Sequence, residues 1–223
     1  IDIALSSRDP QDTAIYFVPN GDVQAKAVEV SFETLRQWIQ KTAQLILANC
    51  NHDKPVIAVL MPAIPEIYPA ILGAMQVGTV FPINWMLDAH ALNDLMQRAE
   101  VKLVIALGPT PGFSIWENVN AAIQGLEKPP QVLTLHEAFS PPAAHDLLTQ
   151  AEKHAGDRLT FDRLTANRNT VACYVHSGGT TGHPKIVKIL HGGMVYRQWA
   201  ANNGLAFTRH DVVLSDTPLF HIG

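Results

Sequence analysis

The residues best suited to chemistry stand in one short stretch, YVHSGGTTGHPK, which runs from Tyr174 to Lys185. An apolar run from 171 to 175 leads into three glycines, which let backbone N–H groups turn toward an anion without a clash from Cβ. Hydroxyl groups and a lysine add hydrogen-bond donors and a positive charge. A strand, a glycine-rich loop and a cation in this order predict a binding site for the phosphates of a nucleotide. The predicted phosphate-binding residues are Ser177, Gly178, Gly179, Thr180, Thr181, Gly182 and Lys185.

The spacing within this loop departs from two common nucleotide-binding patterns. A Walker A loop needs Gly-x4-Gly-Lys-[Ser/Thr], whereas three residues separate Gly178 from Gly182 here, and His183 and Pro184 precede the lysine. The dinucleotide pattern Gly-x-Gly-x-x-Gly does not occur in the sequence. A bare pair of glycines would indicate a hairpin turn, because glycine mainly marks turns. The complete string is more specific and favours phosphate binding over a plain turn.

The string from Ser177 to Lys185 resembles the phosphate loop of the AMP-forming adenylating superfamily, which includes acyl-CoA synthetases, luciferases and the adenylation domains of peptide synthetases. Two further stretches resemble superfamily motifs in the expected order. The segments between Val56 and Asn84 resemble the N-terminal block, and 218–223 resembles the Pro-Leu-Phe-His motif. The doubled glycine and the Pro-Ile-Asn sequence that ends at Asn84 look most like bacterial fatty-acyl-CoA synthetases.

The resemblance covers most of the chain, from about residue 31 to the last residue, with two departures. Ile186 stands where many members have glycine, which reduces backbone freedom just after the lysine. The chain also stops inside the Pro-Leu-Phe-His motif, whereas members of the superfamily continue with segments for adenine and ribose and with a C-terminal lid. The resemblance therefore implies an incomplete, N-terminal part of an adenylate-forming enzyme, which we expect to be inactive by itself.

The implied activity is that of an acyl-CoA synthetase. Such a ligase uses ATP and Mg²⁺ to convert a fatty or other carboxylic acid to acyl-AMP and pyrophosphate, and then transfers the acyl group to CoA. The resemblance also implies a catalytic role for His221, because the corresponding histidine lies near the acyl carboxylate and the α-phosphate and could orient both. The alternative for His221 is a core or loop histidine satisfied by backbone groups. His176, His183 and His191 flank the phosphate loop, and we assign them no catalytic role.

Two other functions stay open on the sequence. An acyl-AMP ligase, or an adenylation domain that loads a carrier protein, would perform the same first step without CoA. A non-catalytic fragment that binds a nucleotide is the alternative from a different class. The presence or absence of the adenine and ribose segments beyond residue 223 would separate catalytic from non-catalytic forms.

Periodic patterns predict the elements that position the loop. The continuous apolar run at 56–60 and the stretch 102–107, which is apolar after Lys102, are typical of strands buried on both faces. Helical spacing and capping residues such as Ser31 predict helices between the strands. This alternation predicts an α/β fold with a largely parallel sheet flanked by helices. The predicted helices cover 31–49, 65–77, 88–100, 115–124, 145–154 and 192–203, and the predicted strands cover 14–18, 27–30, 56–60, 79–82, 102–107, 132–135, 171–175, 185–190 and 212–215.

A change of composition predicts a boundary near residue 165. The segment from 140 to 168 has a Pro-Pro pair, scattered charges and few strand formers. We expect residues 1–165 to form a first α/β subdomain, and residues 166–223 to begin the subdomain that carries the phosphate loop. In this second part a new, short sheet would have unpaired edges and would leave Leu219 and Phe220 exposed.

Composition and charge narrow the range of partners. With 47% hydrophobic and 16% charged residues the chain can bury a core, and its net charge of −4 argues against nucleic acid as a partner. Cys50 and Cys173 have no spaced partners, which predicts a reducing compartment and a cytoplasmic location. The histidines have no metal-binding spacing, so we predict no metal held by the protein itself. The uncharged stretch 67–87 is broken by Pro69 and Pro82, which argues against a transmembrane span and leaves peripheral membrane contact open.

Overall fold

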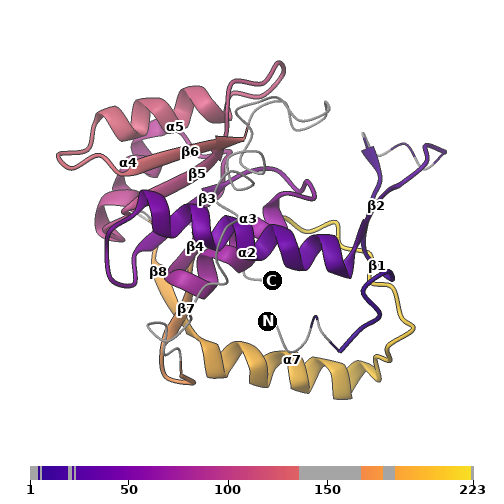
Figure 1. The fold of residues 1–223 in the computed structure, drawn as a ribbon. Helices are drawn as coiled ribbons and strands as arrows, with labels where there is room; N and C mark the ends of the chain where they lie inside the picture. The colour runs from indigo at the N-terminus through magenta and orange to yellow at the C-terminus, as the bar shows by residue number, and fades with distance from the viewer. Residues whose placement is uncertain are drawn as a thin grey trace.

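The computed structural model describes residues 5, 7–19, 22, 24–135, 167–177 and 184–221. In this part of the chain, a sheet of six strands has the order β6-β5-β3-β4-β7-β8, and β1 pairs with β2 in a separate hairpin (Figure 1). The strands are β1 (Thr13–Phe17), β2 (Val28–Ser31), β3 (Val56–Leu60), β4 (Thr79–Pro82), β5 (Leu103–Leu107), β6 (Gln131–Leu135), β7 (Val171–His176) and β8 (Ile186–Leu190). The helices are α2 (Phe32–Asn49), α3 (Ile67–Val77), α4 (Ala89–Arg98), α5 (Ile115–Gln124) and α7 (His191–Leu205).

The centre of the sheet is parallel and buried. β3 pairs in parallel with β4 and β5, β5 with β6, and β4 with β7, whereas β8 runs antiparallel to β7. Every residue of β5 is buried, and so are Ile57 to Leu60 of β3, which means that both strands are covered on both faces. Continuous apolar runs are what such strands require. The predicted α/β fold with a largely parallel sheet flanked by helices is confirmed.

Helices cover both faces of this sheet. The β3–α3–β4 connection leads one way across the sheet and the β4–α4–β5 connection leads back, so right-handed crossovers place α3 and α4 on opposite faces. α2 packs beside α3, and α5 packs beside α4 (Figure 1). Ser31 and Asp88 precede α2 and α4, and each side chain accepts a hydrogen bond from an N–H three residues later. Of the helices described, none is long and apolar enough to cross a membrane.

The C-terminal part of the chain differs from the expectation. β7 and β8 extend the sheet of β3 to β6 instead of starting a new one, because β7 pairs with β4 at Val80 and Cys173. The strand predicted at 212–215 is wrong: this segment has no regular structure, and Leu214 is 93% exposed. An isolated apolar run gains nothing from an extended conformation unless a second strand pairs with it.

The predicted exposure of two apolar side chains near the end of the chain is also wrong. Leu219 packs against the large core of the sheet, and Phe220 is only 8% exposed. The chain after α7 therefore returns to the body of the molecule (Figure 1). The predicted helix at 145–154 and the predicted boundary near residue 165 fall within 136–166, outside the described residues, and stay predictions.

Substitution of Gly78 by alanine tests how closely the chain is packed where α3 meets β4. A Cβ at Gly78 would overlap the carbonyl oxygen of Pro55, and this oxygen accepts a hydrogen bond from the Thr79 N–H (2.9 Å). We expect Gly78→Ala to lower the free energy of unfolding by about 1–3 kcal/mol, because backbone must move to make room. Urea denaturation of the full-length protein measures this change.

Gly193 in α7 provides the matched control, since a Cβ there would meet no atom within 4 Å. Gly193→Ala should leave stability unchanged or raise it by up to about 1 kcal/mol, because alanine favours helix over glycine. Equal effects of the two substitutions would contradict the packing described here.

Candidate functional site

The predicted phosphate loop connects β7 with β8, and the structure describes its two ends. Beyond the last ladder pair, the Ser177 N–H donates to the Lys185 carbonyl oxygen (2.9 Å), and the Lys185 N–H donates to Ser177 Oγ (3.0 Å). We call these two hydrogen-bonded residues the neck of the loop. The predicted ligands between them lie outside the described residues: Gly178, Gly179, Thr180, Thr181 and Gly182.

The neck fixes which groups of its two residues a ligand could use. The N–H groups of Ser177 and Lys185 are already bonded to each other's oxygen atoms, so a phosphate would contact the side chains instead. The Ser177 hydroxyl accepts one bond and still has its own hydrogen to donate. The Lys185 side chain is exposed, which makes its ammonium group accessible to an anion.

On the β7 side, His176 links the neck to the neighbouring strand. The Asn84 N–H, just beyond β4, donates to His176 Nε2 (3.0 Å), and His176 Nδ1 lies 3.2 Å from the Ser177 carbonyl oxygen. Because Nε2 accepts, the neutral ring must have its hydrogen on Nδ1 and donate it to Ser177. His176 is 9% exposed, and its ring meets the Phe81 ring edge-on, with 6.2 Å between centroids.

On the β8 side, Arg98 at the end of α4 contacts the residue before Lys185. Its guanidinium donates to the Pro184 carbonyl oxygen (2.6 Å) and also pairs with Asp94 one turn earlier (2.8 Å). The carboxylate therefore orients the guanidinium toward the loop, although both groups are partly exposed and the pair itself adds little stability. The neck is thus connected to two other parts of the fold, through His176 and through Arg98.

His221, the predicted catalytic histidine, is exposed and lies in a turn near the end of the described chain. Its N–H donates to the Pro218 carbonyl oxygen (2.9 Å), and the preceding residues Leu219 and Phe220 are packed inward. These contacts hold the backbone of the turn, and His221 itself is exposed. The structure therefore brings Ser177 and Lys185 together and describes His221 in a turn of its own.

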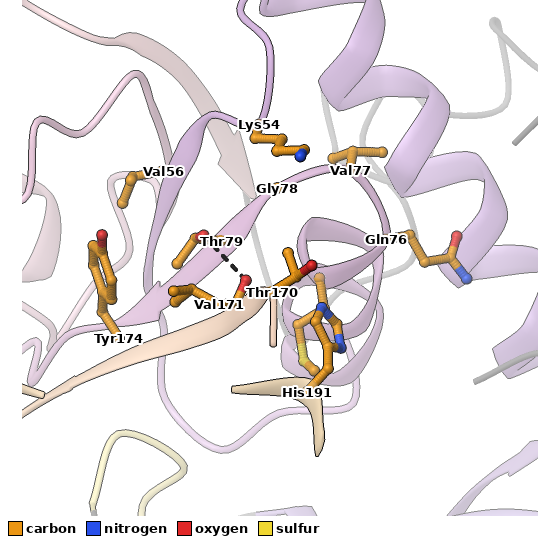
Figure 2. A pocket seen from close by; sticks show the side chains of 11 residues that line it. Lys54, Val56, Gln76, Val77, Gly78, Thr79, Thr170, Val171, Tyr174 and His191 are labelled. Atoms are coloured by element: carbon orange, nitrogen blue, oxygen red, sulfur yellow. Dashed lines mark hydrogen bonds between the residues drawn. The ribbon is translucent and has the colours of Figure 1, made fainter. Parts of the chain in front are cut away.

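A separate cavity of about 260 Å³ lies at the opposite ends of β4 and β7 (Figure 2). Thr79 and Val171, the first residues of these strands, line it, and the Thr79 hydroxyl donates to the Val171 carbonyl oxygen (3.4 Å). Lys54, Tyr174 and His191 also face this space (Figure 2). Ligands of open α/β sheets bind beyond the carboxyl ends of the strands, whereas this cavity is at the amino ends. We therefore place the candidate site at the neck.

A model of the AMP-binding enzyme family matches residues 5–223. The chain belongs to this family. The superfamily that the loop motif indicated is therefore confirmed, and the match spans almost the whole chain.

Relatives within the family differ in what their names say they act on. The chain is 28% identical to a marinolic acid–CoA ligase of Pseudoalteromonas sp. (strain SANK 73390), over 94% of the chain and 32% of that protein. It is 27% identical to the fatty acid–[acyl-carrier-protein] ligase ScoC of Streptomyces coeruleorubidus, over 87% of the chain and 35% of that protein. The chain thus spans about a third of the length of these curated relatives.

A solved structure has the same fold over almost the whole of this chain. ATP-bound MatB from Rhodopseudomonas palustris matches with a TM-score of 0.76 and 21% identity, over 98% of this chain and 40% of that one. At this identity the likeness concerns the fold alone. It covers the sheet and the hairpin of β7 and β8 that holds the neck.

Some residues of the site gave a weak signal or none in the sequence. His176 was seen beside the loop, but its partner Asn84 is 92 positions away and its other neighbour is a backbone oxygen. Arg98 is separated from Pro184 by 86 positions and reads as an ordinary charge at the end of a helix. Their roles depend on β7 lying beside β4, and the sequence alone did not place β7 there.

Burial sets the charge of the histidine at the neck. Burial lowers the pKa of His176 below its usual value, while the Ser177 carbonyl oxygen partly opposes this by favouring the protonated ring. A protonated ring would also point an Nε2–H at the Asn84 N–H, donor against donor. The link between Asn84 and the neck therefore requires the neutral imidazole.

The lowered pKa of His176 predicts how stability depends on pH. The unfolded chain takes up this proton near its usual pKa of about 6.5, whereas the folded protein takes it up only at lower pH. His176 should therefore add no pH dependence to the free energy of unfolding above pH 6.5. Below pH 6.5, the free energy of unfolding should fall as the pH drops. Urea denaturation between pH 8 and pH 5 measures the dependence. His176→Phe should make it shallower, and an identical pH dependence in the two proteins would contradict the assignment.

Proposed function

We propose that the protein containing this chain is an AMP-forming acid–thiol ligase that activates a fatty acid. A carboxylate oxygen attacks the α-phosphorus of ATP, the bond to the bridging oxygen of the β-phosphate breaks, and pyrophosphate leaves. The thiol sulfur of CoA then attacks the acyl carbonyl carbon, AMP leaves, and the thiol proton passes to solvent. The products are acyl-CoA, AMP and pyrophosphate.

The observation that supports this proposal is the pair of hydrogen bonds at the neck. Two hydrogen bonds hold Ser177 and Lys185 together at the carboxyl end of β7, where open α/β sheets bind their ligands. The segment between these residues supplies glycines and threonine hydroxyls, and the neck itself supplies a hydroxyl hydrogen and an ammonium group. Donors that are already in place when charge develops on the departing pyrophosphate stabilise the transition state more than mobile ones.

The loop residues and His221 have separate roles in the proposal. Ser177 to Gly182 and Lys185 hold the β- and γ-phosphates, and Mg²⁺ arrives with ATP as its phosphate complex, offsetting part of the charge. His221 donates a hydrogen bond that orients the acyl carboxylate and the α-phosphate. The described residues contain no group of three or more His, Cys, Asp or Glu side chains that could hold a metal ion.

Details of the sequence favour a fatty acid as the substrate and CoA as the acceptor of the acyl group. One relative favours a carrier protein as the acceptor instead. The doubled glycine at 178–179 and the Pro-Ile-Asn sequence at 82–84 resemble fatty-acyl-CoA synthetases, and a CoA ligase is among the relatives. The relative ScoC is a ligase for an acyl carrier protein. Loading of a carrier protein is therefore the second candidate. Cys50 and Cys173 are free thiols, which supports a cytoplasmic location for either reaction.

Release of pyrophosphate by the full-length protein tests the proposed function. We expect release that needs ATP, Mg²⁺ and a fatty acid, and we expect acyl-CoA to appear when CoA is added. Product formed on a phosphopantetheinylated carrier protein, and none on CoA, would select the second candidate. No pyrophosphate release with fatty, aromatic or short-chain acids would refute adenylation and favour a non-catalytic nucleotide-binding protein.

Replacement of Lys185 tests the charge at the neck. Loss of a charged hydrogen bond to phosphate should weaken ATP binding by about 1.5–3 kcal/mol, or roughly ten- to a hundredfold in Kd. Isothermal titration of the full-length Lys185→Ala variant with ATP measures this. Lys188→Ala is the matched control, since Lys188 is also exposed and lies in β8, which begins directly after Lys185. An equal Kd for Lys185→Ala and Lys188→Ala would remove Lys185 from the site.

A further inference from the structure

His176 lies beyond the point where the backbones of β4 and β7 pair. These two strands pair at one position, Val80 with Cys173. Further along, the Asn84 N–H donates to the His176 ring nitrogen Nε2 (3.0 Å) instead of to a backbone oxygen of β7. A side chain thus continues the connection between the strands up to the first residue of the neck.

The position of Asn84 is itself fixed by a hydrogen bond. Its side-chain oxygen accepts a hydrogen bond from the Met86 N–H (3.0 Å), so the chain leaves β4 in a defined turn. The Phe81 ring, which is fully buried in the core, meets the imidazole edge-on. The ring of His176 is therefore oriented by the rigid centre of the sheet, and through Nδ1–H it sets the position of the Ser177 carbonyl oxygen (3.2 Å).

We propose that His176 is a positioning residue for ATP: its two ring nitrogens hold the Asn84 turn and Ser177 together and so fix the neck. This inference rests on the proposed function, because it assumes that the neck supports the phosphate-binding loop. His176 does not touch the nucleotide in this account. It acts through Ser177, whose carbonyl oxygen it binds and whose N–H and hydroxyl oxygen join Lys185.

Packing alone would not need a histidine at this position. A phenylalanine would fill the same space against Phe81, without the cost of burying two polar nitrogens. The hydrogen bonds of His176 connect two backbone segments that are 92 positions apart, and one of these segments begins the candidate site. A role in positioning therefore predicts an effect on ATP that a role in packing does not.

The test compares three variants of the full-length protein. His176→Phe keeps an aromatic ring against Phe81 and removes both hydrogen bonds. His176→Gln keeps an acceptor and a donor on one side chain. Val175→Ala is the matched control, because Val175 is buried in the same strand (7% exposed) and makes neither of the two bonds.

Two measurements separate positioning from packing. The first is amide hydrogen exchange by NMR at Ser177 and Lys185, which does not depend on activity. We expect exchange at least tenfold faster in His176→Phe than in Val175→Ala, with His176→Gln in between. The second is steady-state kinetics, in which we expect the KM for ATP to rise about tenfold in His176→Phe, the magnitude of one lost hydrogen bond. The KM for the acid should change less than twofold.

Several results would overturn the inference. Equal exchange at the two amides in His176→Phe and Val175→Ala would make His176 an ordinary core residue. Faster exchange with an unchanged KM for ATP would show that the neck does not serve ATP. If His176→Phe does not fold, ¹⁵N NMR of the histidines in the unmodified protein at pH 8 provides the test. It shows which ring nitrogen of His176 carries the hydrogen. A hydrogen on Nε2 of His176 would contradict the proposal, because Asn84 could not then donate to it.

A failure of the proposed function is distinguishable from a failure of this inference. Absence of ATP-dependent pyrophosphate release by the unmodified protein refutes the ligase activity. Hydrogen exchange at Ser177 and Lys185 then still decides whether His176 holds the neck.

Discussion

Two hydrogen bonds between Ser177 and Lys185 determine what the glycine-rich segment can do. A segment rich in glycine has many conformations, and a ligand that had to order all of them would bind weakly. The neck joins the two ends of the segment before any ligand arrives, so part of the entropy of closing the loop is lost on folding instead of on binding.

The neck depends on the sheet that supports it. β3 and β5 are buried on both faces, and β4 connects this rigid centre to β7. Protein interiors are packed as densely as organic crystals, so a site attached to them is held in place. His176 and Arg98 extend this support beyond the strands, from the turn after β4 and from the end of α4. The core therefore contributes to the candidate site by holding the neck in place.

The sequence predicted the parts of the fold that local patterns determine. The apolar runs of β3 and β5, the Ser31 cap and the helical spacing of α2 and α5 each have a single physical interpretation, and the structure agrees with them. Position 212–214 shows the limit of this reasoning, since Val-Val-Leu has strand propensity but no described partner strand. Pairing between β4 and β7, and with it the Asn84–His176 link, joins residues about ninety positions apart. Contacts of this kind depend on topology, which single-sequence patterns do not encode.

The central claim is that the segment between Ser177 and Lys185 binds the phosphates of ATP. The most direct measurement is an NMR titration of the full-length, ¹⁵N-labelled protein with Mg²⁺-ATP and, in parallel, with adenosine. The account predicts that ATP shifts the backbone amide signals of residues 178–183 more than those of any other segment, and that adenosine leaves these signals in place. ATP binding that shifts other segments and leaves the signals of 178–183 unchanged would contradict it.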